Sequence, residues 1–238
     1  MNAAVILAGG KGERFMAAIP KQFVHLGSKP VIQHTFEAFY LHPDIDVICL
    51  VLPKERVATI EEKYRKEYPG KTLLFVSGGQ NRQESTANAL KALSEKLTAD
   101  DVVLIHDAVR PFVSPRIISD NVKFTQQYGA VDTVIPAEDT IVESFDGETI
   151  TNIPPRKRFY AGQTPQSFRF GLIREVYAAI TVEDMESVTD DASLVLKKNL
   201  PVYLVAGEKH NFKITTPWDL MLAEALLKMS LEEEEQKA

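Results

Sequence analysis

Short apolar runs alternate with amphipathic stretches through the first half of the chain. Four uninterrupted runs are suited to buried strands: 3–7, 47–52, 73–76 and 102–105. Three stretches with a helical rhythm of polar and apolar residues separate them: 30–40, 55–67 and 85–97. Strands that are covered on both faces are apolar throughout, and helices supply that cover. The alternation therefore predicts an α/β protein with a mostly parallel sheet.

The pattern changes beyond Arg116. The elements expected there are a helix to Tyr128, a strand over 130–135, helices over 170–180 and 191–198, a strand over 202–205 and a final helix capped by Thr216. Two β-rich runs, 140–142 and 149–153, flank Asp146-Gly147, a dipeptide typical of hairpin turns. We therefore interpret about 138–160 as an arm that protrudes from one domain spanning 1–238.

Composition excludes several classes of protein. The 238 residues carry 27 Lys and Arg against 33 Asp and Glu, which gives a formal net charge of −6. No run of about 18 apolar residues could span a bilayer, and the first residues lack the charged leader of a secreted protein. We therefore expect a cytoplasmic protein with no membrane partner. The acidic balance also argues against a nucleic-acid partner.

The cysteine content limits the metal chemistry. Cys49 is the one cysteine, so the chain can form neither an internal disulfide nor a thiolate zinc site. Any metal should therefore be held by oxygen ligands. Within its apolar strand, Cys49 is expected to be an inert core residue.

Candidate chemistry begins where the first apolar run ends, in the loop Ala8–Arg14. Its three glycines allow backbone N–H groups to surround phosphate oxygens. Lys11 and Arg14, with Lys21 further along, can neutralise a triphosphate. The spacing fits neither a P-loop nor a dinucleotide fingerprint, because no Gly-Lys-Ser/Thr is present and Phe15 replaces the third glycine. At this point the alternative stays open that the glycines only make a tight turn.

A carboxylate and a guanidinium follow the fourth apolar run, at Asp107 and Arg110. Open α/β sheets bind ligands just beyond the carboxyl ends of their strands. Asp107 would suit Mg2+ on triphosphate oxygens, and Arg110 would suit a phosphorylated second substrate. A local ion pair that closes a loop is the alternative for these two residues. Lys213, alone before the final helix, would ordinarily be interpreted as a solvated lysine.

Taken together, the motifs carry a resemblance to a known family. They are 8–14, Pro20-Lys21-Gln22, Gly78-Gly79 followed by Ser85, 106–111, Asp139-Thr140, Thr164-Pro165-Gln166 and 213–215. Their order over nearly the whole chain resembles that of sugar- and polyol-phosphate cytidylyltransferases. The resemblance implies a Rossmann-like nucleotidyltransferase domain in which CTP and a polyol phosphate react to give a CDP-polyol and pyrophosphate, with Mg2+ as cofactor.

Two branches of that family compete as the nearest relatives. The stretches 128–134, 139–142 and 162–168 resemble the D-ribitol 5-phosphate branch of teichoic acid synthesis. Val142 also stands where the 2-C-methyl-D-erythritol 4-phosphate branch of isoprenoid synthesis commonly has lysine. Against this, 189–193 resembles the methylerythritol branch. Ribitol 5-phosphate is the preferred acceptor, and methylerythritol phosphate is the alternative.

The resemblance also implies roles for individual residues. The catalytic cations would be Arg14, Lys21 and Lys213. The nucleotide would be bound by Ala8, Gly9, Gly10, Gly12, Gly79 and Ser85. The acceptor would be bound by Arg110, Thr140, Arg156 and Lys213. Asp107 would ligate Mg2+.

Arg156 falls where the family has an arginine on an arm that reaches a neighbouring subunit's site. The resemblance therefore implies a homodimer with arm exchange and a composite active site. A solvated basic cluster formed by 156–158 is the alternative. Two other functions also stay open from the residues themselves, a nicotinamide-dependent reductase and a noncatalytic nucleotide sensor. The missing third glycine argues against the reductase.

Overall fold

A seven-stranded sheet forms the centre of the computed structural model, which describes residues 1–10, 19–181, 183–184 and 187–235. Its strands lie in the order β5-β4-β1-β6-β8-β7-β9. Their bounds are β1 Asn2–Leu7, β4 Val47–Leu52, β5 Thr72–Ser77, β6 Val102–Asp107, β7 Ala130–Pro136, β8 Tyr160–Arg169 and β9 Tyr203–Ala206. A separate two-stranded ribbon pairs β2 (His25–Leu26) with β3 (Lys29–Pro30).

Most neighbouring strands of the sheet run parallel. β1 pairs in parallel with β4 and β6, β4 pairs in parallel with β5, and β9 pairs in parallel with β7. β8 is antiparallel to both of its neighbours, β6 and β7. The predicted α/β class with a mostly parallel sheet is confirmed.

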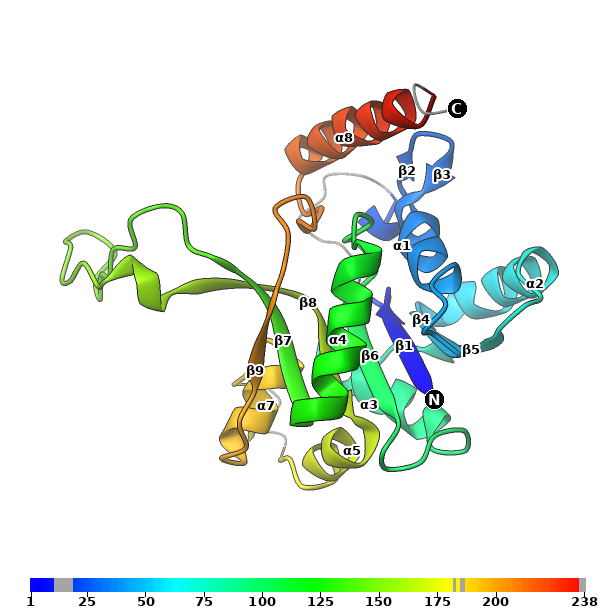
Figure 1. Cartoon of the computed structure of the whole chain (residues 1–238), viewed down its shortest axis with the longest axis horizontal. Coiled ribbons are helices and arrows are strands. Elements are labelled where there is room, and N and C mark those ends of the chain that lie inside the picture. Colours follow the sequence, from blue (N-terminus) through cyan, green and yellow to red (C-terminus); the bar gives the residue numbers. More distant parts are fainter. Residues whose placement is uncertain (11–18, 182, 185–186, 236–238) are drawn as a thin grey trace.

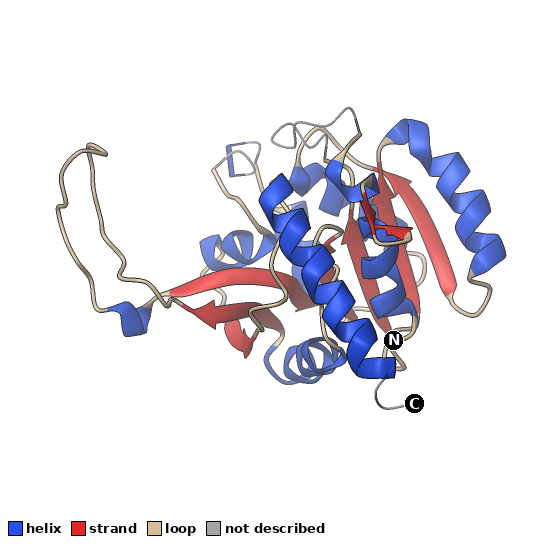
Figure 2. Ribbon diagram, turned by 90° about the horizontal axis from the view of Figure 1, so that it is seen from above, coloured by secondary structure: helices blue, strands red, loops and turns tan. Residues whose placement is uncertain are grey.

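Helices cover both faces of the sheet (Figures 1 and 2). Their bounds are α1 Val31–Tyr40, α2 Val57–Glu67, α3 Arg82–Leu93, α4 Pro115–Tyr128, α5 Phe170–Ala178, α7 Asp191–Lys197 and α8 Pro217–Glu235. One hydrophobic cluster joins the sheet to α1, α2 and α4, and a second joins its other face to α3, α5 and α7. α8 packs through Ala223 against β2 and against the loops that precede α8 in the chain.

β1 shows why its sequence is apolar at every position. Ala4 and Ile6 belong to the first hydrophobic cluster, whereas Ala3 and Val5 belong to the second. Alternate side chains of a strand point to opposite faces, and all four are fully buried. Cys49 lies in the same core on β4, where burial raises the pKa of its thiol to about 12. It is the inert core residue that we expected.

The predicted arm protrudes between β7 and β8, and in both views it extends away from the sheet (Figures 1 and 2). Its tip turns at Asp146, which accepts hydrogen bonds from the backbone N–H of Glu148 and Thr149, and Gly147 has a φ of 77°. A single bridge, between Glu143 and Asn152, joins the two sides. The strands expected at 140–142 and 149–153 are therefore not formed in this chain.

Sequence reasoning missed β8 altogether. Proline is disfavoured inside a sheet, so the Thr164-Pro165 dipeptide argues against a strand, yet β8 continues through it with a cis peptide bond. α3 also begins three residues earlier than predicted, because the Asn81 side chain accepts a hydrogen bond from the Glu84 N–H and caps it. None of the described helices is both long and apolar enough to cross a membrane.

Candidate active site

A cavity of about 830 Å³ lies at the carboxyl ends of β1 and β6. Leu7 and Asp107 are register partners at the ends of these parallel strands, so the segments that follow both strands leave the sheet at one edge. The cavity is lined by Leu7, Ala8, Gly9, Gly10, Lys21, Gln22, Gly79, Gln80, Asn81, Arg82, Ser85, Asp107, Val109, Lys213 and Thr215. Its volume and position are typical of a ligand site in an α/β protein.

The structure brings together most of the residues that sequence reasoning selected. Those that line the cavity are Ala8, Gly9, Gly10, Lys21, Gly79, Ser85, Asp107 and Lys213. Gly12 and Arg14 lie outside the described residues. Thr140 and Arg156 lie on the arm, exposed, and are not among the cavity-lining residues. Of the predicted acceptor set, Lys213 lines the cavity, and Arg110 does not line it but contacts Asp107, which does. Within one chain the set is therefore not brought together in the cavity.

Two glycines pack against each other beside the cavity. A Cβ added to Gly78 would lie 3.2 Å from the Gly9 Cα and 3.2 Å from the Ser85 Oγ. The Ser85 Oγ accepts a hydrogen bond from the Gly79 N–H at 3.0 Å and donates one to the Asn81 carbonyl oxygen at 2.8 Å. The hydroxyl of Ser85 thus fixes the loop after β5 on the start of α3, and the backbone of Gly9 packs closely against this loop.

Gln22 is a site residue that sequence reasoning did not select. It lies next to Lys21 in the short 3-10 helix Lys21–Phe23, and its side chain is almost fully buried. Its amide nitrogen donates to the carbonyl oxygens of Ala8 at 2.7 Å and Gly10 at 2.8 Å. The Pro20-Lys21-Gln22 motif therefore anchors the start of the glycine loop as well as supplying a cation.

Three cations surround the carboxylate of Asp107. Lys213 Nζ lies 2.8 Å from Oδ2, Arg110 Nε lies 3.7 Å from the same oxygen, and Arg82 Nε lies 3.7 Å from Oδ1. Burial opposes ionisation of Asp107, but these cations hold the pKa of its carboxyl well below its usual range. Arg110 Nε has no hydrogen-bond partner among the described residues, and its Nη1 donates to the Asn211 carbonyl oxygen.

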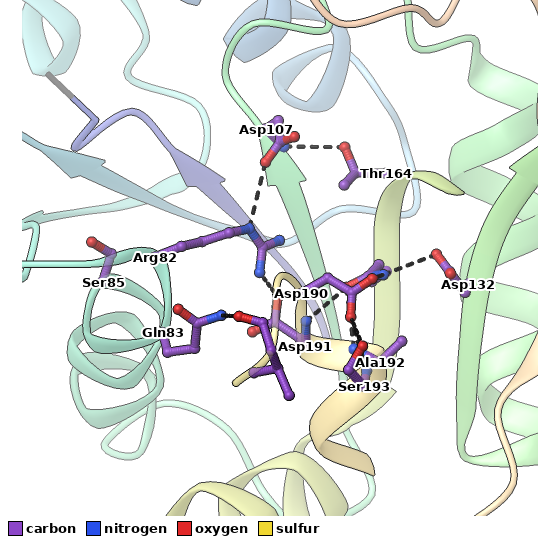
Figure 3. A network of polar contacts seen from close by, with 12 residues as sticks. Arg82, Gln83, Ser85, Asp107, Asp132, Thr164, Asp190, Asp191, Ala192 and Ser193 are labelled. Carbon is purple, nitrogen blue, oxygen red and sulfur yellow. Dashed lines mark hydrogen bonds and ion pairs between the residues drawn. The ribbon is translucent and has the colours of Figure 1, made fainter. Parts of the chain in front are cut away.

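Arg82 is the second residue that sequence reasoning missed. As Figure 3 shows, it lies between Asp107 and Asp191, and its Nη1 is 2.5 Å from Asp191 Oδ2. Burial disfavours its charge, but the two carboxylates raise the pKa of the guanidinium above its usual range. Its position between the Gly78-Gly79 pair and Ser85 was the available signal, since a phosphate-binding loop commonly has a cation nearby.

His106 is not available as a general base. Burial lowers the pKa of its imidazole to about 4, so the ring is neutral near pH 7. Its Nε2 is 3.0 Å from the Arg110 carbonyl oxygen, and its Nδ1 is 3.0 Å from Thr164 Oγ1. Both ring nitrogens are therefore used to join the loop after β6 to β8.

The cavity offers few oxygen donors for Mg2+. Among the described residues, no group of three or more His, Cys, Asp or Glu side chains is placed to hold a metal. Asp107 offers one carboxylate at the mouth of the cavity. Mg2+ in phosphate-transfer sites is bound by substrate phosphates, waters and only one or two carboxylates. The donor set therefore fits an ion that arrives on a triphosphate and does not fit a cage built by protein alone.

Comparison with known proteins gives consistent matches. The family model for 2-C-methyl-D-erythritol 4-phosphate cytidylyltransferase matches residues 2–229. The 4-diphosphocytidyl-2C-methyl-D-erythritol synthase of Anaerococcus prevotii is 30% identical, with a TM-score of 0.80 and coverage of 95% of this chain and 98% of that one. The 2-C-methyl-D-erythritol 4-phosphate cytidylyltransferase of Thermus thermophilus is 34% identical, with a TM-score of 0.75 and the same coverage.

These matches favour the methylerythritol branch, the alternative, over the ribitol branch that the sequence analysis preferred, and they do not support a link to teichoic acid synthesis. The preference depended partly on Val142, which lies on the arm, is 53% exposed and does not line the cavity of its own chain. The stretch that pointed to the other branch, 189–193, contains the buried Asp191 that contacts Arg82.

Proposed function

The chain belongs to the 2-C-methyl-D-erythritol 4-phosphate cytidylyltransferase family, and from this premise we propose how its residues transfer a cytidylyl group from CTP to 2-C-methyl-D-erythritol 4-phosphate. An oxygen of the acceptor phosphate attacks the α-phosphorus of CTP and forms the new P–O bond. The bond to the β-phosphate oxygen breaks, and pyrophosphate leaves with its electron pair. No protein nucleophile is needed, so catalysis depends on positioning and on stabilising charge.

The observation that carries this proposal is the joining of a glycine loop and a cation cluster in one cavity. Both substrates are anions. Two like unit charges about 4 Å apart repel by about 4 kcal/mol at an effective dielectric of about 20, and these substrates carry several charges each. Lys21, Arg82 and Lys213 all line the cavity, where they can offset that repulsion.

The two ends of the cavity suit the two substrates. We assign CTP to the loops after β1 and β5, with contacts from Ala8, Gly9, Gly10, Gly12, Gly79 and Ser85. Arg14 and Lys21 would stabilise the reacting α-phosphate. Lys213 and Arg110 would bind the acceptor phosphate, because both cations converge on Asp107 at the end of β6.

Mg2+ is part of the proposal. Asp107 would hold the ion together with phosphate oxygens of CTP, and the ion would supply positive charge to the triphosphate. Asp107 suits this role because its surrounding cations keep it ionised over the working pH range.

We also assign Thr140 and Arg156 to the acceptor site of a partner subunit in a homodimer. Both lie on the arm, which extends away from the sheet of its own chain (Figure 1). The arm exposes apolar side chains that its own chain does not cover: Val142, Phe145, Ile150 and Ile153. An exposed apolar segment of this kind marks a contact surface.

An acceptor panel tests the function directly. Purified protein with CTP and Mg2+ is supplied separately with methylerythritol phosphate and ribitol 5-phosphate, and pyrophosphate release is measured. We expect turnover with methylerythritol phosphate and little or none with ribitol phosphate. Lys213→Ala should lower kcat/KM by at least about tenfold, whereas Lys228→Ala, which removes an exposed lysine on α8, should not. Preferential turnover of ribitol phosphate would refute the proposed acceptor.

A further inference from the structure

Arg82 spans two carboxylates that come from distant parts of the chain. It is the first residue of α3, its Nη1 lies 2.5 Å from Asp191 Oδ2, and its Nε lies 3.7 Å from Asp107 Oδ1 (Figure 3). The guanidinium is planar and presents donors in a rigid fork, so one arginine can hold two carboxylates in a fixed relation. A lysine, which has a single compact ammonium, cannot reproduce that geometry.

Asp191 gives Arg82 a rigid anchor. It is fully buried at the start of α7, and its Oδ1 accepts a hydrogen bond from the Tyr177 hydroxyl at 2.5 Å. Its backbone N–H donates to Gln166 Oε1 at 3.0 Å. Because its side chain and backbone are both held, Asp191 fixes the guanidinium of Arg82, and the Nε of Arg82 faces Oδ1 of Asp107.

The other oxygen of Asp107 is engaged from the opposite side. Oδ2 faces Lys213 Nζ at 2.8 Å and Arg110 Nε at 3.7 Å, whereas Oδ1 faces Arg82. Cations on both oxygens set the rotation of the carboxylate. Without Arg82, both oxygens would be free to turn toward Lys213 and Arg110 and to occupy the donors of these two residues.

We propose that Arg82 is a positioning residue: anchored on Asp191, it holds Oδ1 of Asp107 away from Lys213, so that the Lys213 ammonium pairs with Oδ2 alone and keeps its remaining donors for the phosphate of the acceptor. This inference rests on the proposed function, because it assumes that Lys213 binds the acceptor. It adds a residue that acts through Asp107, and it predicts that the acceptor end of the cavity depends on a contact made at the start of α3.

A purely structural role for Arg82 has to be separated from this one. Removing Arg82 alone would leave the buried carboxylate of Asp191 without its cation, which is strongly destabilising. The double variant Arg82→Gln/Asp191→Asn removes both charges together and should fold. Arg82→Lys keeps a cation beside Asp191 but loses the planar set of guanidinium donors that can contact two carboxylates. Tyr177→Phe removes another partner of Asp191 and leaves the contact between Arg82 and Asp107 in place, so it is the matched control.

Steady-state kinetics provide the first readout. We expect the double variant to raise the KM for methylerythritol phosphate about 10–100-fold, while the KM for CTP changes less than about twofold. Arg82→Lys should also have a raised KM for methylerythritol phosphate. Tyr177→Phe should leave the KM values for CTP and for methylerythritol phosphate near those of the unmodified chain. Full rescue by Arg82→Lys, an increase confined to the KM for CTP, or unchanged kinetics in a folded double variant would each overturn the proposal.

A crystal structure of the double variant provides a readout that does not depend on activity. We expect the Asp107 carboxylate to rotate so that both oxygens contact Lys213 and Arg110. An unchanged Asp107 would overturn the proposal even if the kinetics were altered. If the unmodified chain failed to use methylerythritol phosphate, the proposed function would fail, and the rotation of Asp107 would still decide the role of Arg82.

Discussion

The side-chain amide of Gln22 donates a hydrogen bond to the carbonyl oxygen of Ala8 across 2.7 Å, and its second hydrogen is donated to Gly10. These two carbonyls lie on either side of Gly9 at the start of the glycine loop. Because Gln22 adjoins Lys21, the same contacts fix where that cation lies relative to the loop. A buried amide of this kind is satisfied only in one arrangement of the loop.

Gln22→Met should therefore weaken the nucleotide site. Methionine has similar length but no donor, so both carbonyl oxygens lose a partner at a cost of about 2 kcal/mol in the free energy of unfolding. We expect kcat/KM for CTP to fall by about tenfold. Gln33→Met is the control, since Gln33 is also buried but bonds Glu37 and Tyr68 away from the cavity. Equal losses of activity in both variants would show that only general stability had changed.

Gly78→Ala tests the contact between the loops after β1 and β5. The added Cβ would lie 3.2 Å from both the Gly9 Cα and the Ser85 Oγ, which is too close without movement of one loop. We expect an increase of about tenfold in the KM for CTP and a loss of about 1 kcal/mol in stability. Gly162→Ala on β8 is the control, because its Cβ would meet Asp132 Oδ2 at an ordinary 3.9 Å. Unchanged CTP binding in Gly78→Ala would show that the loops can separate freely.

The periodicity of the sequence was sufficient to predict most of the strands and helices of the fold. Continuous apolar runs located β1, β4 and β6 because these strands are buried on both faces. The run 73–76 also located β5, an edge strand that is only partly buried. β8 could not be found this way. Its middle is polar and contains Pro165, and its buried polar residues are satisfied by partners from distant segments, such as Ser167 with Asn121.

The sequence also predicted some residues of the candidate site and missed others. Motifs next to strand ends predicted Lys21, Asp107 and Lys213, which the fold brings to one cavity. Arg82 was missed because the neighbouring glycine pair could suggest only a nearby cation, whereas its contact with Asp191 is made 109 residues away in the sequence. The roles of Thr140 and Arg156 stay predictions, since their proposed partners belong to a second subunit.

The half-buried carboxylate of Asp132 should make stability depend on pH. Burial, together with the neighbouring Asp190, raises the pKa of Asp132 to about 7, although Gln166 donates hydrogen bonds to both carboxylates (Figure 3). The folded state therefore binds a proton that the unfolded state, with a pKa of about 4 at this side chain, has already lost. Its contribution to stability is complete below about pH 4 and is lost as the pH rises to about 7 and above.

Asp132→Asn removes this titration and keeps an oxygen that can accept from Gln166. We expect the variant to become more stable than the unmodified chain as the pH rises from about 4 to 8, by on the order of 2 kcal/mol. Urea unfolding at several pH values measures the difference. Parallel stability curves for the two proteins over that range would show that Asp132 is ionised throughout in the folded state.

A mixture of two inactive variants tests the shared site. If each cavity uses Lys21 of one subunit and Arg156 of its partner, Lys21→Ala and Arg156→Ala should complement each other. A mixed dimer then has one site with both residues intact and one with neither. Random exchange should therefore restore about a quarter of the activity of the unmodified dimer.

Lys21→Ala mixed with Lys213→Ala provides the matched control, because both residues line the same cavity of one chain. No mixed dimer of that pair has an intact site, so no activity should return. Native mass spectrometry establishes that subunits have exchanged in both mixtures. If mixed dimers of the Lys21→Ala and Arg156→Ala chains form and remain inactive, Arg156 does not act in the partner's site, and the exposed arm must serve contact between subunits without completing the cavity.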